Sequence, residues 1–224
     1  MLYTIGMSRR GVPLVQGEYY HVYNRGSNKQ DIFKDEQDKR RFVKLLALLN
    51  QKPRLRTEDS SIGNVFEKKD APLVAIGAYA IMNNHFHIVL KQLDEKGVTI
   101  FMQKLGTAYA MYFNQKYKRT GVLFEGRFKT KHIDDDMYMR YLYAYVHLNP
   151  AKLVDSLWKE KILKRRKEVI TFIKQYPYSS FHDYCDIVRP ENGVLDRTHF
   201  PIYFKTPKHF TESILSWLTI NPEE

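Results

Sequence analysis

Cysteine, long apolar runs and acidic residues are scarce in this chain of 224 residues, and each scarcity excludes a class of protein. The single cysteine, Cys185, excludes an intramolecular disulfide and a multi-cysteine zinc site, and it fits the reducing cytoplasm. No uninterrupted apolar run approaches the roughly 20 residues that a membrane-spanning helix needs. Residues 1–6 lack the charged-then-apolar order of a signal peptide. We therefore expect a cytoplasmic protein with no membrane partner.

The charge balance indicates a polyanionic partner. The chain carries 36 Lys and Arg residues against 25 Asp and Glu, which gives a net charge of +11. Such an excess favours binding to nucleic acid or to an anionic membrane surface. No basic amphipathic helix with a large apolar face is visible, and 16 tyrosines offer rings on which unpaired bases can stack. Nucleic acid is therefore the favoured partner.

Hydrophobic periodicity predicts the order strand, helix, strand, strand, helix, strand and helix before residue 150. The expected strands cover residues 18–24, 73–82, 85–92 and 127–133, and the expected helices cover 35–50, 98–117 and 134–148. The last helix begins at three aspartates that can cap it, and Pro150 ends it. The first six elements spell the split βαβ pattern of a ferredoxin-like antiparallel sheet with helices on one face. We therefore expect an α+β fold.

The expected domain organisation is a main domain over residues 1–155 and a C-terminal extension, residues 156–224, that packs on it. The extension is predicted to be mainly helical or irregular, with a basic helix over 158–174 and then an aromatic, loop-rich tail. Residues 176–181 in this tail could equally form a buried strap. Residues 53–72 are polar and poor in core residues, which predicts a long loop.

Two histidines one residue apart form the most informative motif. They follow the pair Asn83-Asn84, which suits a tight turn between two antiparallel strands. Side chains alternate along a strand, so His85 and His87 point to one face while Phe86 points to the other. Two adjacent imidazoles form half of a site for a divalent metal. An isolated pair of this kind more often binds nothing, so the motif needs further residues.

The predicted third helix can supply them. Tyr138, Tyr141, Tyr145 and Asn149 recur at helical spacing, and the last two lie one turn apart on one face. The amide oxygen of Asn149 could be a third metal ligand, with the phenol of Tyr145 beside the metal. A divalent metal polarises a phosphodiester, and a tyrosine oxygen can attack its phosphorus to form a phosphotyrosine. Aromatic residues at this spacing are, however, more often the core face of a helix.

Four motifs within residues 16–155 occur in a fixed order. They are Tyr-His-Val-Tyr-Asn-Arg-Gly at 20–26, His-Phe-His at 85–87, Gly-Val-Leu-Phe-Glu-Gly-Arg-Phe-Lys at 121–129 and Tyr-Leu-Tyr-Ala-Tyr-Val-His-Leu-Asn-Pro at 141–150. Together they resemble the single-tyrosine HUH transposases, and within them the REP-associated tyrosine transposases of bacteria. Residues 178–181 also resemble an aromatic-Ser-Ser-aromatic stretch of the REP-associated branch.

The resemblance implies a metal-dependent, single-strand-specific DNA endonuclease and strand transferase on a ferredoxin-like sheet. It implies that His85 and His87 are metal ligands, that Tyr145 is the nucleophile and that Asn149 is the third ligand. The implied cofactor is Mg²⁺ or Mn²⁺, with no small-molecule cofactor. The family commonly has proline where this chain has Asn83, a change that should leave the ligands in place.

The resemblance also implies the substrate, which is single-stranded DNA near short REP-type hairpins with a recognition tetranucleotide. A bacterial, nucleoid-associated location follows from such a substrate. We expect phosphate contacts from basic residues near the motifs, and a row of three on one strand face is the strongest candidate. The candidate residues are Arg25 and Lys29, followed by the row Arg127, Lys129 and Lys131.

Several alternatives remain open from the sequence. Tyr141 and Tyr143 are alternative nucleophiles, although Tyr143 lies about 200° around the helix from Tyr145, so both cannot face one metal. The protein could instead be a transposase derivative that binds hairpin DNA or RNA without cutting it. It could also be an unrelated metal-dependent phosphodiesterase with water as nucleophile. The C-terminal extension favours a monomer over the dimers formed by insertion-sequence relatives.

Overall fold

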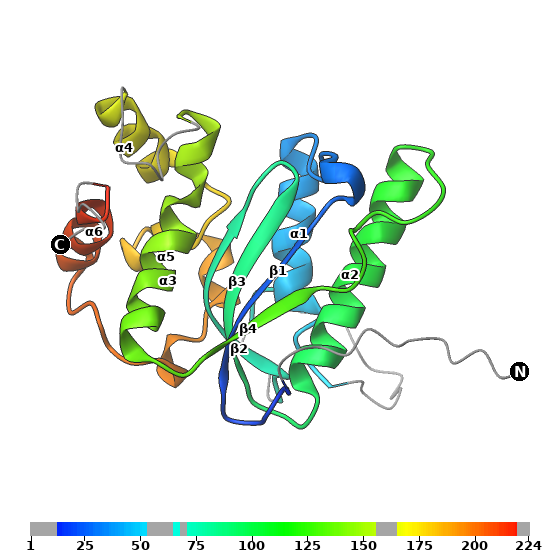
Figure 1. The fold of residues 1–224 in the computed structure, drawn as a ribbon, viewed down its shortest axis with the longest axis horizontal. Coiled ribbons are helices and arrows are strands. Elements are labelled where there is room, and N and C mark those ends of the chain that lie inside the picture. Colours follow the sequence, from blue (N-terminus) through cyan, green and yellow to red (C-terminus); the bar gives the residue numbers. More distant parts are fainter. Residues whose placement is uncertain (1–12, 53–64, 68–70, 156–164, 219–224) are drawn as a thin grey trace, which may run out of the picture.

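The computed structural model describes residues 13–52, 65–67, 71–155 and 165–218 (Figure 1). Its strands are β1 (Tyr19–Arg25), β2 (Val74–Ile81), β3 (His85–Gln92) and β4 (Lys129–Ile133). Its α-helices are α1 (Glu36–Leu48), α2 (Gly97–Lys116), α3 (Asp136–Leu148), α4 (Arg166–Gln175), α5 (Phe181–Tyr184) and α6 (Pro207–Ser216). Its short 3-10 helices are η1 (Ser27–Lys29), η2 (Asn149–Leu153), η4 (Pro190–Val194) and η5 (Arg197–His199). Most of the predicted long loop and the first part of the predicted basic helix lie outside the described residues.

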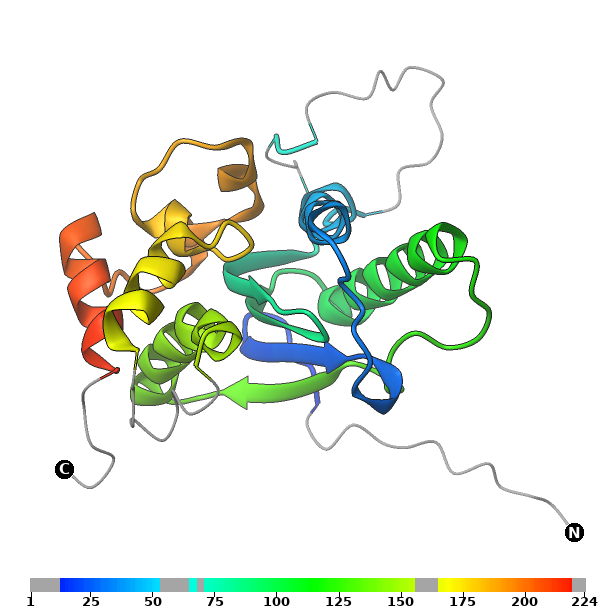
Figure 2. The same ribbon diagram turned by 90° about the horizontal axis from the view of Figure 1, so that it is seen from above.

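The four strands form one sheet in the order β2-β3-β1-β4, and every neighbouring pair is antiparallel. Helix α1 connects β1 to β2, and α2 connects β3 to β4. This order and connectivity are those of the ferredoxin-like split βαβ arrangement, which confirms the predicted α+β fold. Helices α1 and α2 share one face of the sheet, as predicted, and α3 covers the other face (Figures 1 and 2).

The face under α1 and α2 is the apolar core. Phe86 of β3 packs against Phe42 of α1, with ring centroids 4.8 Å apart, and Phe42 packs edge-on against Tyr109 of α2 at 5.0 Å. All three rings are buried, and burial of each such ring contributes about 2–3 kcal/mol to stability. Because Phe86 points into this core, the alternation of β3 directs His85 and His87 to the opposite face.

The Asn83-Asn84 turn is fixed by the chain that follows β1. The carbonyl oxygen of Asn83 accepts hydrogen bonds from the backbone N–H groups of Ile32 and Phe33, both at 2.9 Å. The carbonyl oxygen of Asn84 accepts from the N–H of Gly26 at 2.8 Å. A side chain at Gly26 would lie 2.2 Å from the carbonyl oxygen of Gln30, so glycine is required there. These bonds hold the turn although Asn83 replaces the proline common in the family.

Helix α3 begins with a capped turn and ends before a proline. The side chain of Asp135 accepts a hydrogen bond of 2.6 Å from the N–H of Tyr138, which stabilises the first turn. The α-helix ends at Leu148, and the chain continues as η2 with Pro150 at its start. Met139, Leu142 and other residues of one side are buried. The predicted helix and its end at the proline are confirmed.

Residues 178–180 form a strap along the free edge of β2. Ser180 donates its N–H to the carbonyl of Tyr79, and Ile81 donates to that of Tyr178, both at 2.9 Å. The pairing of Ala80 with Ser179 is an antiparallel bridge. Of the two readings of residues 176–181, the buried strap is therefore correct. The strap covers an edge that would otherwise expose unpaired backbone groups.

A buried serine–histidine contact connects this strap to α3. The ring of His147 donates from Nδ1 to the carbonyl oxygen of Tyr143 and accepts from the hydroxyl of Ser180 at Nε2, each at 2.8 Å. Ser180 also accepts a bond of 2.9 Å from the N–H of Tyr79 on β2. Burial lowers the pKa of His147 to about 4, so the ring is neutral at pH 7 and fits this pair of bonds.

An ion pair beneath the strap is also buried. Nη2 of Arg189 lies 2.6 Å from Oδ2 of Asp183, and the same nitrogen donates to the carbonyl oxygen of Ser179 at 2.7 Å. The side chains of Arg189 and Asp183 are 11% and 3% exposed, so water cannot replace either partner.

No helix among the described residues is long and apolar enough to cross a membrane.

We expect Asp183→Asn to lower the free energy of unfolding by about 3 kcal/mol, because it leaves the guanidinium of Arg189 buried without its counter-charge. Urea unfolding followed by circular dichroism measures this change. Asp186→Asn is the matched control, since Asp186 lies 3.8 Å from Arg197 in an exposed pair and its loss should cost less than about 0.5 kcal/mol. Equal stabilities of the two variants would show that the buried pair does not hold the strap.

Candidate active site

Three predicted site residues meet between β3 and α3. The rings of His85 and His87 lie side by side on the α3 face of the sheet, with centroids 5.1 Å apart. The ring of Tyr145 approaches His87 edge-on, at a centroid distance of 5.2 Å. Asn149 follows one turn later, where its N–H donates to the carbonyl oxygen of Tyr145, and it is 2% exposed. The structure thus brings a phenol to the histidine pair, with a buried carboxamide at the end of the same helix.

A third histidine, His21 of β1, belongs to the same cluster. Its Nε2 lies 2.9 Å from Nδ1 of His87, and its ring is 6.1 Å from that of Tyr145. His21 and His87 are both 6% exposed. Burial, and secondarily the charge of Lys131, lowers the pKa of His21 to about 4. His21 is therefore a neutral hydrogen-bond partner of a candidate metal ligand.

Sequence reasoning missed His21. The available signal was the alternation of β1, which places Tyr19, His21 and Tyr23 on one face. That face meets the histidine pair only because β1 lies next to β3 in antiparallel register, with Tyr23 opposite His87. The sequence of β1 alone does not contain this pairing.

The hydrogen-bond network assigns the tautomer of His85. Its Nδ1 lies 2.6 Å from Oδ1 of Asn84, an oxygen that only accepts, so the proton is on Nδ1 and the lone pair is on Nε2. In the contact between His87 and His21 either ring can donate, and the tautomer of His87 that donates from Nδ1 has its lone pair on Nε2. Such a donated second N–H is the usual way in which a metal-binding histidine is oriented.

The donor set fits a small divalent cation. Imidazole nitrogens suit transition-metal ions and amide oxygens suit Mg²⁺ and Mn²⁺, so His85, His87 and Asn149 together suit Mn²⁺ and accommodate Mg²⁺. The side-chain nitrogen of Asn149 is buried without a hydrogen-bond partner among the described residues, so folding contacts do not fix the orientation of this carboxamide. No cluster of three or more His, Cys, Asp or Glu that could hold a metal occurs in the described part of the chain.

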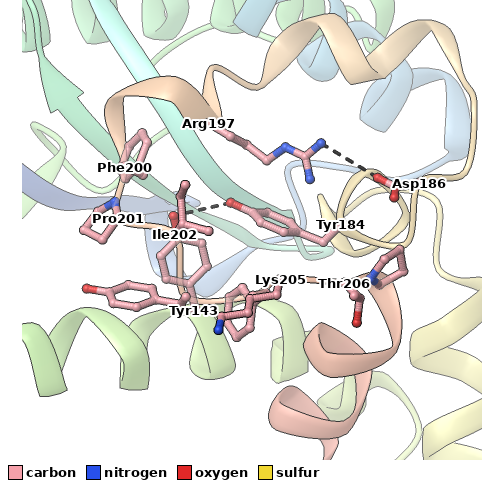
Figure 3. A pocket seen from close by; sticks show the side chains of 12 residues that line it. Tyr143, Tyr184, Asp186, Arg197, Phe200, Pro201, Ile202, Lys205 and Thr206 are labelled. Carbon is pink, nitrogen blue, oxygen red and sulfur yellow. Dashed lines mark hydrogen bonds and ion pairs between the residues drawn. The ribbon is translucent and has the colours of Figure 1, made fainter.

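The alternative tyrosines lie elsewhere. Tyr143 is 1% exposed, and its hydroxyl is 3.3 Å from that of Tyr184. It lines a pocket of about 290 Å³ between α3 and the segment that leads to α6, together with Tyr184 and Tyr203 (Figure 3). Burial raises its pKa well above the usual value, so its phenol stays protonated. Tyr141 is 42% exposed and stacks on Tyr145 without facing the histidines in any contact of the described residues.

Two lysines of β4 lie on the same sheet face as the histidines. The antiparallel register pairs Lys131 with His21 and Lys129 with Tyr23, so all four side chains leave the sheet on the α3 side. Both lysines are exposed. They place positive charge beside the site, where a phosphate backbone could be bound.

Arg25 and Lys29 gather with Lys129 around one carboxylate. The guanidinium of Arg25 forms two bonds to the carboxylate of Glu125, the one from Nη2 at 2.9 Å. The hydrogen bond from Arg25 is the main cause that lowers the pKa of Glu125, and the charges of Lys129 and Lys29 add to it. Three candidate phosphate-binding residues, Arg25, Lys29 and Lys129, therefore all act electrostatically on the carboxylate of Glu125.

Arg127 does not extend the lysine row, contrary to the prediction. Strand β4 begins at Lys129, and Gly126 has a positive φ of 71°, so the chain bends before the strand. Arg127 lines a cavity of about 850 Å³ between α2 and residues 121–128, together with Phe86 of the opposite sheet face. The alternation expected for residues 127–133 therefore holds only within the strand.

Comparisons with known proteins give a family and a structural neighbour. The model of the family described as "Transposase IS200 like" matches residues 15–149, a segment that contains all four strands, α1 to α3 and the cluster around Tyr145. A solved structure of a REP-associated tyrosine transposase bound to a REP hairpin is similar over 88% of this chain and 90% of that chain, with 13% sequence identity and a TM-score of 0.48. No curated protein matches the chain. The family predicted from the four motifs is confirmed, and the chain belongs to the IS200-like transposases.

Proposed function

We propose that this transposase cleaves and rejoins single-stranded DNA near REP-type hairpins through a covalent 5′-phosphotyrosine at Tyr145. The observation that carries the proposal is the edge-on contact of Tyr145 with His87, 5.2 Å between ring centroids, in the same chain. If Tyr145 only packed α3 against the sheet, apolar residues would be expected beside it, whereas its neighbours on the sheet are the imidazoles of His21 and His87. Tyr141 and Tyr143 have surroundings that fit stacking and core packing instead.

In the proposed reaction, the phenolic oxygen of Tyr145 attacks the phosphorus of a phosphodiester in line. A bond forms between phosphorus and Oη, the bond to the 3′ oxygen breaks, and the leaving strand keeps a free 3′-hydroxyl. The phenolic proton is lost and the leaving oxygen gains one, so the step is balanced. Attack of a 3′-hydroxyl on the phosphotyrosine reverses these changes and rejoins the strands.

The residues around Tyr145 have separate tasks in this proposal. His85, His87 and Asn149 would hold Mg²⁺ or Mn²⁺, which when bound would polarise the phosphodiester and stabilise negative charge in the transition state. His21 orients His87 through the hydrogen bond of 2.9 Å between their rings. Lys131, which lies opposite His21 on the neighbouring strand, would contact a phosphate of the bound strand.

Single-stranded DNA is the proposed substrate because of charge and position. The net charge of +11 favours a polyanion, and the exposed Lys129 and Lys131 lie beside the histidines. Arg25 and Lys29 add positive charge at the end of β1. The preference for REP-type hairpins rests on the motif resemblance to the REP-associated branch.

We propose that a monomer performs the reaction, with the tyrosine in cis. Tyr145 and His87 of one chain already lie in contact, and the strap and α6 of that chain pack against β2 and α3. A second copy is not needed to complete the cluster. A dimer in solution whose mixed mutants complement each other in cleavage would contradict this point.

Tyr145→Phe should abolish formation of the covalent adduct, with a loss of at least about 1,000-fold in cleavage rate, because it removes the attacking oxygen and keeps the ring. The variant should still fold and bind labelled single-stranded DNA from the genomic flanks of its own gene. Gel analysis of the adduct measures the loss, and peptide mapping of the wild-type adduct should identify Tyr145.

Tyr141→Phe is the matched control. It removes one phenolic oxygen from the tyrosine one helical turn before Tyr145, and it should leave cleavage unchanged. Wild-type cleavage by Tyr145→Phe, or an adduct on another tyrosine, would refute the assignment. A wild-type protein that binds hairpins but never forms an adduct would favour the non-cleaving alternative. Cleavage without an adduct would favour water as nucleophile.

The histidines should show graded effects on metal-dependent cleavage. The double substitution His85→Ala and His87→Ala should abolish cleavage, as should EDTA, and should leave the fold intact because Phe86 carries the core side of β3. His21→Ala should raise the Mn²⁺ concentration for half-maximal cleavage by about 10- to 100-fold, through loss of the orienting bond. His132→Ala, on the opposite face of β4, is the control. Full cleavage in EDTA would refute the metal site.

DNA binding should weaken steeply with salt. If about five phosphates are neutralised, log K against log salt should have a slope near −3.5, at about −0.7 per contact for a single strand. Replacing Lys129 and Lys131 with alanine should reduce the slope by about 1.4. Lys44→Ala, an exposed lysine on α1, should leave it unchanged. A flat salt response, or tighter binding to plain duplex, would contradict the substrate assignment.

A further inference from the structure

Three tyrosines form a stacked row along α3 that starts at the candidate nucleophile. The rings of Tyr145 and Tyr141 have centroids 5.8 Å apart and an angle of 28° between their planes. The rings of Tyr141 and Tyr138 are 6.2 Å apart at 22°. The row therefore consists of three nearly parallel rings at spacings of four and three residues, and we call it the tyrosine row.

Core packing accounts for only part of the tyrosine row. Tyr138 and Tyr145 pack against the core but are only half-buried, and Tyr141 is 42% exposed. The core side of α3 is formed by other residues, namely Met139, Leu142, Tyr143, Val146 and His147. Large rings that stay accessible on a helix beside an active site offer apolar surface to a ligand, and a nucleobase has a face of matching shape.

Positive charge and a second aromatic residue border the tyrosine row. Nζ of Lys131 lies 4.0 Å from the ring centroid of Tyr138, at the end of the row away from Tyr145. The indole of Trp217, which follows α6, contacts Tyr141 edge-on at 5.7 Å. Aromatic rings next to a lysine that can bind phosphate are the usual composition of a surface that binds single-stranded nucleic acid.

We infer that the tyrosine row is a stacking surface for the unpaired nucleotides next to the scissile phosphate, with Tyr141 as its central contact. The inference rests on the proposed function, because it assumes that single-stranded DNA reaches Tyr145. Lys131 binds a phosphate at the far end, and Trp217 of the C-terminal extension supports the ring of Tyr141 from the side. The extension thereby contributes to substrate binding.

The dimensions of the row suit a short stretch of single strand. Tyr138 and Tyr145 are seven residues apart on α3, about 10 Å along the helix axis. Stacked nucleotides at about 3.4 Å each would span this length with about three residues of DNA. Stacking depends little on base identity, so the row would hold a strand in place without selecting its sequence.

The competing explanation is that Tyr141 only packs α6 against α3 through Trp217. The two explanations differ in what they predict for DNA. A packing role makes Tyr141 important for the stability of the extension and unimportant for the environment of a bound base. A stacking role makes the ring of Tyr141 necessary for the change in fluorescence of a base that binds beside it.

The test uses a 12-nucleotide strand of thymidines with a single 2-aminopurine, moved along the strand, and the full-length protein. We expect the wild type to quench the fluorescence of 2-aminopurine at a few adjacent positions. Tyr141→Ala should lose this quenching and raise the Kd by about tenfold, the effect typical of one base–aromatic stack. Tyr141→Phe should retain both properties, because the ring is what binds.

Met137→Ala is the matched control, because Met137 is 77% exposed on the same helix and lies outside the row. Tyr138→Ala provides a second variant if Tyr141→Ala unfolds, and it should show the same loss of quenching. Circular dichroism and Mn²⁺ binding check that each variant is folded with its histidine site in place. Quenching and a Kd within twofold of wild type in folded Tyr141→Ala, or an equal loss in Met137→Ala, would overturn the inference.

The readout separates this inference from the proposed function, because fluorescence needs no cleavage. A protein that forms the Tyr145 adduct at the wild-type rate with or without the ring of Tyr141 would leave the proposed function intact and refute the stacking surface. Ring-dependent quenching by a wild-type protein that never forms an adduct would support the stacking surface and refute the nucleophile.

Discussion

The antiparallel register of β1 against β3 is the constraint on which the site depends. It places Tyr23 opposite His87 and brings His21 within 2.9 Å of the same ring. A shift of one residue would turn the histidines of one strand into the core and expose its apolar residues. The register is fixed from the other face, where Phe86 has to enter the core beside Phe42. The packing of one sheet face therefore determines the chemistry of the other.

The strap and the buried His147 explain how the helix that carries Tyr145 is held over a polar site. Helix α3 covers the histidines, and its apolar side, which includes Leu142 and Val146, is buried in the core. It is also held by hydrogen bonds, because His147 bonds to Ser180 and Ser180 bonds to the backbone of Tyr79. These contacts tie α3 to β2 through the extension. The position of Tyr145 relative to His87 thus depends on residues far along the chain.

The sequence predicted local features well and failed where long-range pairing decides. Periodicity predicted the order of strands and helices along the chain. It also predicted the sheet faces to which His85 and Phe86 point, and the cap and the end of α3. Each of these features depends on a few neighbouring residues. His21 was missed because its role follows from strand pairing alone. Arg127 was placed wrongly on the β4 face because the bend at Gly126, a positive φ of 71°, is not visible in an alternation of polar residues. The roles of Tyr145, Asn149 and the lysines remain predictions.

Two of the contacts between the extension and α3 have different consequences. Ser180 holds its buried side through His147, and Trp217 contacts its accessible side through Tyr141. The first contact is enclosed and involves neutral, fully bonded groups, so it contributes to position and not to binding. The second involves a ring that remains 42% exposed, so a ligand can still reach it. Under the proposed function, a helix that is supported on its buried side and accessible on its outer side would hold Tyr145 in place while single-stranded DNA contacts the accessible side. A single chain supplies both Tyr145 and the contacts that support its helix, which is the physical basis for proposing that the tyrosine acts in cis.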